Sequence, residues 1–400
     1  MKSEFGLAHL FVFVLAIAFA KMFVFSDIEN WQEKYQLFSV PAKAFPGGDA
    51  RNIQLSAFCE KASESAAGFA QCYEDAPTLR AIYPDVSVPA YNYPSIWVKI
   101  YRFLGDDTEA FFIKFWQVNA LLLLFTIMIL ALKFNPASFA IFAFSPITLL
   151  AIERGNIDAI AMFLSFAPIL LFRGGAFWAA VGFGLAGAAK IFPLFALLAL
   201  AHPRFKRKRK LSLLGLVIAA PLIVLAILDL PSIMSGTTSG FNVSYGLGTL
   251  FKAPVFYGNP TGASVVIVLY LLAVITAIFY ALRPQNLTGC KQKLQHLPDR
   301  DLLLLTGSAA VFIVTFLVFN NWSYRLIFVI PAFMVLSRIS GRLAGFACVN
   351  IVIMFWLPIL PRGWELQNLA SFLLVPVLAM LMVASVQAGK AMAPLPDEAK

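Results

Sequence analysis

The sequence predicts an all-α polytopic membrane protein, built as a bundle of about ten spans with a short helical hairpin and a long first extracytoplasmic loop. Hydrophobic residues make up 60% of the chain and charged residues only 13%, a balance that a water-soluble domain of this length does not show. The apolar runs are long and lack the alternation of a membrane barrel. In lipid, where each backbone polar group needs an internal partner, such runs form helices.

Basic residues give the chain a formal net charge of +10, and they lie mostly in short connectors between apolar runs. This is the positive-inside pattern of membrane proteins. A nucleic-acid partner would instead need a basic face on a folded soluble domain, so we expect no nucleic-acid binding. The sequence also holds no Walker loop, no Rossmann glycine fingerprint and no Cys/His cluster with zinc spacing.

The first apolar run covers residues 5–25, which as a helix spans roughly 31 Å and crosses a hydrocarbon core of about 30 Å. Ala18-Phe19-Ala20 has the composition of a cleavage site, but the run continues beyond it. We therefore expect an uncleaved anchor, with a cleaved signal peptide as the alternative. The other predicted spans are residues 111–132, 134–152, 157–172, 211–230, 263–282, 301–319, 322–338, 343–360 and 367–389.

Alternating these spans from a cytoplasmic N-terminus gathers most basic connectors on one side of the membrane. The connectors contribute Lys133, Arg173, residues 204–210, residues 283–300, Arg338, Arg342 and Lys390. The predicted extracytoplasmic loops are residues 26–110, 153–156, 231–262, 320–325 and 361–366. Residues 1–400 are expected to form one transmembrane domain.

Residues 176–201 depart from this alternation, because Arg173 precedes them and the basic run 204–210 follows them. Both ends then face the cytoplasm, which predicts a hairpin that breaks at Lys190-Ile191-Phe192-Pro193, with arms of about 13 residues, or roughly 20 Å each. Lys190 would lie at the tip, where irregular backbone is tolerated only if it is buried in protein or lines a wet cavity. The alternative is one long helix that kinks at Pro193, with a snorkelling lysine.

The loop at residues 26–110 is the only long polar segment, and two amphipathic stretches in it, residues 27–38 and 95–104, are expected to lie on the membrane surface. Cys59 and Cys72 both lie in this loop. They either form a disulfide or stay as two unpaired thiols, and the sequence is compatible with both alternatives.

Asp49 follows Gly47-Gly48, which let the backbone turn sharply before an amphipathic segment at residues 50–73. An Asp at such a place is most often a helix N-cap. The alternative is a carboxylate held at the mouth of a membrane cavity. Further along the loop, Tyr91-Asn92-Tyr93-Pro94 combines two phenols with an amide, a composition suited to stacking on a sugar and hydrogen bonding it.

Glu153-Arg154-Gly155-Asn156-Ile157-Asp158 turns between two predicted spans with almost no loop, so charged groups lie close to hydrocarbon. Ionisable residues at that depth usually face the bundle interior. The alternative is an internal Glu153–Arg154 pair that merely closes the turn.

A second polar group lies at the start of the predicted span 322–338, whose apolar part is too short to cross alone. The span must recruit its flanks, which draws Arg325 below the outer boundary. A guanidinium at that depth needs an anionic partner, and phosphate suits its forked donors. The alternative is a side chain that snorkels upward.

The order of these features resembles the GT-C superfamily, membrane glycosyltransferases that use polyprenyl-phosphate-linked sugars, and within it glycosyltransferase family 87. The residues that carry the resemblance are Gly48-Asp49 with Asn52, Tyr91-Asn92-Tyr93-Pro94-Ser95, Gly155-Asn156, Gly187-Ala188-Ala189-Lys190-Ile191-Phe192-Pro193 and Tyr324-Arg325-Leu326-Ile327-Phe328. Asn156 stands where members of family 87 often have Gln, and the tyrosine usual after the first-loop Asp is missing. The resemblance is therefore closer to the superfamily than to the family.

The resemblance implies an inverting transfer of a hexose or pentose, with mannose favoured, from a polyprenyl-phosphate sugar to a hydroxyl of a cell-surface glycan or glycolipid. The protein would be a multi-pass protein of the plasma (inner) membrane with its active site on the extracytoplasmic side. Asp49 would be the general base, and the donor phosphate would meet Arg325, Lys190 and Tyr324. The sugar or acceptor would meet Tyr91, Asn92, Tyr93, Asn156, Glu153, Arg154 and Asp158.

We expect no cofactor and no required metal, because the two cations would carry the phosphate charge. The alternative function is a lipid-linked-glycan flippase or a transporter, in which buried Lys and Arg line a path. Transporters tend to have two matching halves with interrupted helices in corresponding places, whereas this sequence has one broken segment and one long loop.

Overall fold

A computed structural model describes residues 6–25, 28–38, 40, 53, 94–104, 109–231, 244–253, 259–283, 285–318 and 321–391. The described part of the chain is mostly helical, and its one sheet consists of the two short strands β1 (Ser244–Tyr245) and β2 (Asn321–Trp322). Asp49, the Tyr91-Asn92-Tyr93 motif and the two cysteines Cys59 and Cys72 lie outside the described residues.

Seven described helices or helix pairs are long and apolar enough to cross a membrane. They are α1 with η1 (Leu7–Phe19, Ala20–Val24), α7 (Glu109–Lys133), η3 with α12 (Pro203–Lys208, Arg209–Leu228), α14 (Pro260–Leu282), α16 (Asp299–Val318), α18 with η7 (Arg342–Trp356, Leu357–Ile359) and α19 (Gly363–Ala391). The pair α9 (Pro146–Arg154) and α10 (Asp158–Leu171) makes up to an eighth span, bent by 115°. The predicted class of all-α membrane protein is confirmed, while the count of ten spans stays a prediction.

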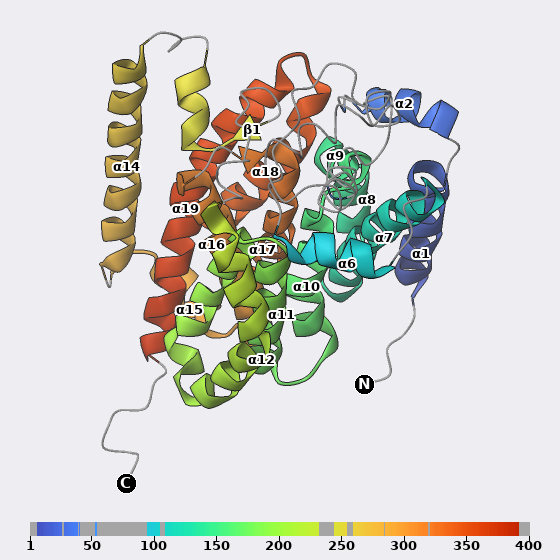
Figure 1. Cartoon of the computed structure of the whole chain (residues 1–400). Helices are drawn as coiled ribbons and strands as arrows, with labels where there is room; N and C mark the ends of the chain where they lie inside the picture. Colours follow the sequence, from blue (N-terminus) through green and yellow to red (C-terminus); the bar gives the residue numbers. More distant parts are fainter. Residues whose placement is uncertain are drawn as a thin grey trace.

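The other described helices are shorter. They are α2 (Ile28–Leu37), α6 (Ile96–Leu104), α8 (Ser138–Ala143), α11 (Gly175–Ala189), η2 (Phe192–Ala201), η4 (Leu247–Lys252), α15 (Thr288–Gln295), η6 (Ser323–Val329) and α17 (Ile330–Leu336). The amphipathic stretches predicted at residues 27–38 and 95–104 form α2 and α6. Figure 1 shows α6 crossing the direction of the long helices, as a helix on a membrane surface would.

The bundle has α14 and α19 side by side at one edge and α1 at the other, with α16 and α17 between them (Figure 1). The first turn of α1 and the last turn of α19 lie at the same end of the bundle, in keeping with termini on one side of a membrane. α14 turns large apolar side chains outward, among them Val268 and Leu269, which are more than half exposed. Such a surface fits contact with lipid tails.

Aromatic side chains fill the centre. The ring of Phe142 meets Phe333 and Phe355 edge to face, with centroids 4.8 and 4.9 Å apart. All three are less than a tenth exposed, and they tie α8 to α17 and α18. Edge-to-face pairs of this kind add about 0.5–1.5 kcal/mol each beyond the burial of their surface.

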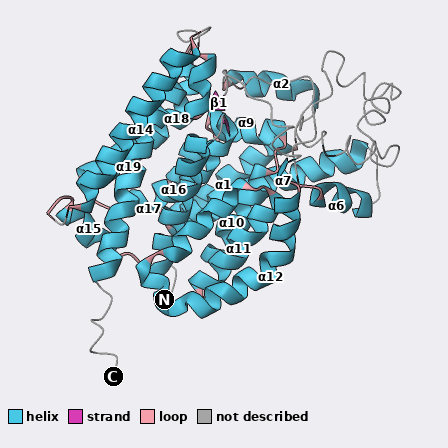
Figure 2. Cartoon of the chain, turned by 60° about the vertical axis from the view of Figure 1, so that its left-hand side comes forward, coloured by secondary structure: helices cyan, strands magenta, loops and turns pink. Residues whose placement is uncertain are grey.

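α11 and α12 lie side by side (Figure 2) and run in the same direction. Gly215 in α12 faces the backbone of Phe177 and the side chain of Ala180, and Gly184 in α11 faces Ala219, so residue numbers rise together along both helices. Two helices that start at the same end require the chain to return between them. η2 provides that return, which is the geometry of the predicted hairpin.

This geometry gives a first testable prediction. Single cysteines at Arg173 and Lys206, in a chain whose four native cysteines are replaced by serine, should react with a membrane-impermeant thiol reagent from the same side of sealed vesicles. A cysteine at Thr261, in the first turn of α14, is the matched control and should react from the opposite side. Labelling of the first two positions from opposite sides would contradict the hairpin.

Candidate functional site

Three interruptions of regular helix meet in the middle of the molecule. The first separates α9 from α10, where Gly155 takes a left-handed conformation with φ 60° and ψ 34°. Glycine adopts this conformation without the steric cost that a side chain brings. The side-chain oxygen of Asn156 then accepts the backbone N–H of Asp158 at 2.9 Å, which satisfies the first N–H of α10.

The second interruption is the tip of the hairpin. α11 ends at Ala189, Lys190 is extended with φ −156° and ψ 133°, and η2 begins with Pro193 in its first turn. Proline lacks a backbone N–H and is therefore suited to a helix start. Gly187 packs directly on Leu194, so the two arms approach closely at the tip.

The third interruption precedes Arg325. β1 and β2 pair antiparallel, with Tyr245 opposite Asn321 and Ser244 opposite Trp322. η6 starts at the next residue, Ser323. The strand pair thus ties the loop that contains Tyr245 to the segment that positions Arg325.

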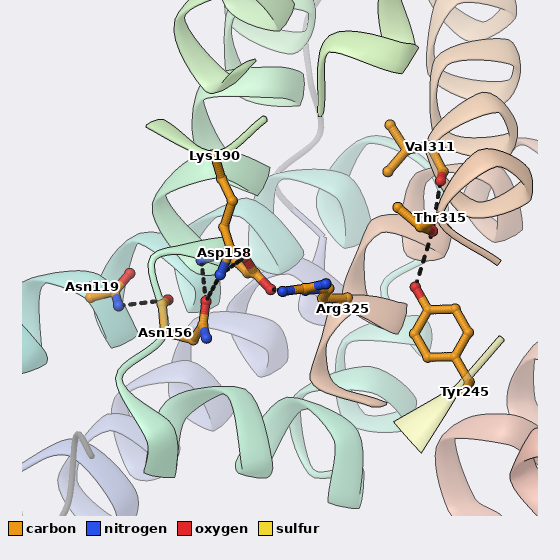
Figure 3. Close-up of polar contacts among 8 residues, drawn as sticks. All are labelled: Asn119, Asn156, Asp158, Lys190, Tyr245, Val311, Thr315 and Arg325. Carbon is orange, nitrogen blue, oxygen red and sulfur yellow. Dashed lines mark hydrogen bonds and ion pairs between the residues drawn. The ribbon is translucent and has the colours of Figure 1, made fainter. Parts of the chain in front are cut away.

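These interruptions bring Asp158, Lys190 and Arg325 together (Figure 3). The Nζ of Lys190 lies 2.9 Å from Oδ1 of Asp158, and the Nε of Arg325 lies 3.4 Å from Oδ2. Lys190 also donates to the side-chain oxygen of Asn156 at 2.9 Å, and Asn119 donates to the backbone oxygen of Asn156 at 2.8 Å. We call Asn156, Asp158, Lys190 and Arg325 the charged cluster.

The charged cluster is deeply buried. The side chain of Asp158 is fully buried, and those of Lys190 and Arg325 are only 9% and 10% exposed. Charges withdrawn from water are stable only when they are paired, and each oxygen of Asp158 serves a different cation. The guanidinium of Arg325 also lies over the ring of Phe192, 5.1 Å from its centroid, which restrains its plane.

A guanidinium and an ammonium that converge from two separate elements present donors that an oxyanion can accept. Arginine offers a planar fork of donors, and lysine offers a compact point charge that can turn its donors. In the structure the carboxylate of Asp158 takes this place. A phosphate oxygen has the same acceptor chemistry and would compete for the same donors.

Apolar side chains wall the charged cluster on the side of α6. The indole N–H of Trp97 donates to the backbone oxygen of Ala189, next to Lys190, at 2.8 Å. Trp97, Tyr101 and Ile53 are buried together with Ile157, which lies between Asn156 and Asp158. Ile53 and α6, both from the segment 26–110, therefore contribute packing at both of the first two interruptions.

The structure adds Tyr245, which the sequence reasoning missed. Its hydroxyl lies 3.1 Å from that of Thr315, and Thr315 donates to the backbone oxygen of Val311 at 2.8 Å (Figure 3). Burial raises the pKa of Tyr245 to about 12, so the phenol is neutral at ordinary pH; the charges of Arg325 and Asp158 also act on it. Neither the single charged residue in 231–262, Lys252, nor a catalytic motif marks this tyrosine.

The other predicted site residues are placed as follows. Glu153 is buried and forms an ion pair with Arg154 at 3.2 Å, as in the turn-closing alternative. Tyr324 is buried in η6 beside Arg325. The predicted roles of these residues, and those of Asp49, Tyr91, Asn92 and Tyr93, stay predictions.

Metal ligands do not gather in the part of the chain that the structure describes, where no group of three His, Cys, Asp or Glu side chains is placed to hold an ion. Comparison with protein-family models, with curated proteins and with solved structures found no match to this chain.

Proposed function

We propose that the chain is an inverting glycosyltransferase that takes a hexose or pentose, with mannose favoured, from a polyprenyl-phosphate sugar to a hydroxyl of a cell-surface glycan or glycolipid. One observation carries the proposal. Lys190 and Arg325 come from two separate helix interruptions, and both reach the same buried acidic group, so their donors are arranged around the space of one oxyanion. A lipid-linked sugar phosphate presents that group at membrane depth.

The chemistry assigns each group one task. The acceptor oxygen attacks the anomeric carbon opposite the phosphate, and the bond from that carbon to the phosphate oxygen breaks with its electron pair on the phosphate. Lys190 and Arg325 stabilise the charge that develops there. Asp49 takes the proton of the acceptor hydroxyl, and the configuration at the anomeric carbon inverts.

Ile53, four residues after Asp49 in the sequence, is buried in the wall beside Asn156 and Asp158. Asp49 itself lies outside the described residues. Its role as the base rests on the resemblance to the GT-C superfamily.

Purified protein incubated with a radiolabelled polyprenyl-phosphate sugar and candidate acceptors tests the proposal. We expect label to move from the lipid to the acceptor with inversion at the anomeric carbon. The rival function, a flippase or transporter, also accommodates buried Lys and Arg. It would instead move the labelled lipid across sealed vesicles with its glycosidic bond intact, and that result would overturn the proposal.

Replacing Arg325 with Lys should weaken donor binding on the order of tenfold, or about 1.4 kcal/mol, because a charge remains but the fork of donors is lost. Donor affinity is measured by displacement of the labelled lipid. Arg338→Lys is the matched control, since Arg338 also lies over an aromatic ring, that of Phe134, at the far end of α17. Unchanged donor affinity in Arg325→Lys would leave Arg325 as an anchor alone.

A further inference from the structure

Five exposed basic side chains gather at the end of the bundle where α11 and α12 begin. The parallel packing of these helices sets Arg173, which precedes α11, near the level of the first turn of α12, because Phe177 faces Gly215. None of the five forms an ion pair with a residue that the structure describes. They are Arg173, Lys206, Arg207, Arg209 and Lys210, which we call the basic surface.

The remaining two cations of the run 204–210 are paired with a carboxylate and have a structural role. The Nε of Arg204 lies 2.7 Å from Oδ1 of Asp299, and the Nζ of Lys208 lies 2.5 Å from Oδ2. Arg204 also donates to the backbone oxygen of Leu297 at 2.6 Å. These contacts tie η3 to the start of α16. Arg204 and Lys208 therefore help to hold η3 against α16. Among the described residues, the basic surface makes no ion pair of this kind.

The neighbours of the basic surface place it at the boundary between water and lipid. Phe172 and Trp178 stack with ring centroids 4.5 Å apart at the start of α11, and tryptophan favours the level of the lipid headgroups. Further along α12, beyond the level of Trp178, Val217, Ile218 and Val224 are each more than half exposed, as expected of side chains against hydrocarbon. Cations thus stand at headgroup level, directly beside apolar side chains that face the acyl chains.

We propose that the basic surface binds the headgroups of acidic phospholipids in the adjoining leaflet, with their acyl chains along the outer face of α12. The combination of unpaired cations and an adjacent apolar face matches a lipid that carries a phosphate charge and two chains. A zwitterionic lipid offers no net charge to these cations. Clusters of four to eight basic residues next to a span attract anionic lipid in this way.

Native mass spectrometry of the full chain in a mild detergent, mixed with phosphatidylglycerol and phosphatidylcholine of the same acyl chains, tests this site. The parent chain should retain phosphatidylglycerol in preference. The variant Lys206→Gln/Arg207→Gln/Lys210→Gln should lose affinity for it by about fivefold for each charge removed. Raising the salt from about 0.1 M to about 1 M shortens the screening length from about 10 Å to about 3 Å and should weaken binding by the parent.

Arg283→Gln/Arg342→Gln/Lys390→Gln is the matched control, because it removes three exposed charges elsewhere. It should keep the preference for phosphatidylglycerol. Equal retention of the two lipids by the parent, or equal loss in the two triple variants, would overturn the proposal. Displacement of the lipid by glycerol phosphate at equal concentration would also overturn it, since the headgroup alone would then suffice. All the substituted side chains are exposed, so an unchanged elution profile verifies the fold of each variant.

Discussion

Replacing Asp49 with Asn should lower turnover by about a hundred- to ten-thousand-fold, the usual contribution of a general base. Asn keeps the shape of the side chain and caps a helix about as well as Asp, so a structural role survives the change. Only the proton acceptor is removed. The measurement is single-turnover transfer of labelled sugar at saturating lipid donor, with donor affinity measured separately and expected to be unchanged.

Asp85→Asn, a substitution of the same kind in the same outer loop, is the control and should leave turnover near that of the parent. If Asp49→Asn transfers sugar at the parental rate, Asp49 acts as a cap and the base lies elsewhere. Glu153 and Asp158 are then the next candidates, because both carboxylates are buried at the turn between α9 and α10. Loss of both turnover and donor binding would speak for a structural role instead.

Replacing Asp158 with Asn should destabilise the fold by about 3–5 kcal/mol, because Lys190 and Arg325 lose their shared buried counter-ion. The free energy of unfolding is measured by denaturant titration in detergent micelles. Asp299→Asn is the control. Asp299 also bridges two cations, but its side chain is 28% exposed, so water screens the loss and we expect about 1 kcal/mol or less.

The double variant Asp158→Asn/Lys190→Met gives the sharper result. Removing one of the two uncompensated cations should recover part of the lost stability, so the double variant should be less destabilised than the sum of the two single variants. Additive effects would show that Asp158 and Lys190 do not interact. They would also remove the main support for an oxyanion site between Lys190 and Arg325.

Charge placement alone was enough to predict much of the fold. Arg173 and the run 204–210 required a return of the chain between them, and η2 makes that return with its break at Lys190. The short apolar part of its span predicts that Arg325 lies below the membrane boundary; its side chain is 10% exposed in the bundle, and its depth in the membrane stays a prediction. Both predictions follow from the free-energy cost of placing a charge in lipid. This cost depends on each charged residue and its distance along the chain from the apolar runs, so it can be predicted from a single sequence.

Contacts between distant segments were not predictable in this way. The meeting of Asp158, Lys190 and Arg325 depends on a 115° bend between α9 and α10. A glycine in a turn predicts that the chain bends, but it does not predict the angle of the bend. Tyr245 is tied to the segment that precedes Arg325 because Ser244 and Tyr245 pair with Trp322 and Asn321, a pattern too short to give a periodic signal. The ion pair between Glu153 and Arg154 could not be predicted from sequence either. Adjacent charges are compatible both with a pair that closes the turn and with side chains that face the interior of the bundle.

The glycine contacts between α11 and α12 have a mechanical consequence. A Cβ at Gly184 would stand 2.5 Å from that of Ala219, so the two helices approach closely at this point. An interface packed in this way resists both compression and sliding, and the two helices move as one stiff body. Lys190 follows the last residue of α11, at the end of this helix pair, whereas Arg325 belongs to η6, which is a separate element. Asp158 contacts both cations, so motion of η6 against the α11–α12 pair would change at least one of the two distances that meet at Asp158, 2.9 Å to Lys190 and 3.4 Å to Arg325.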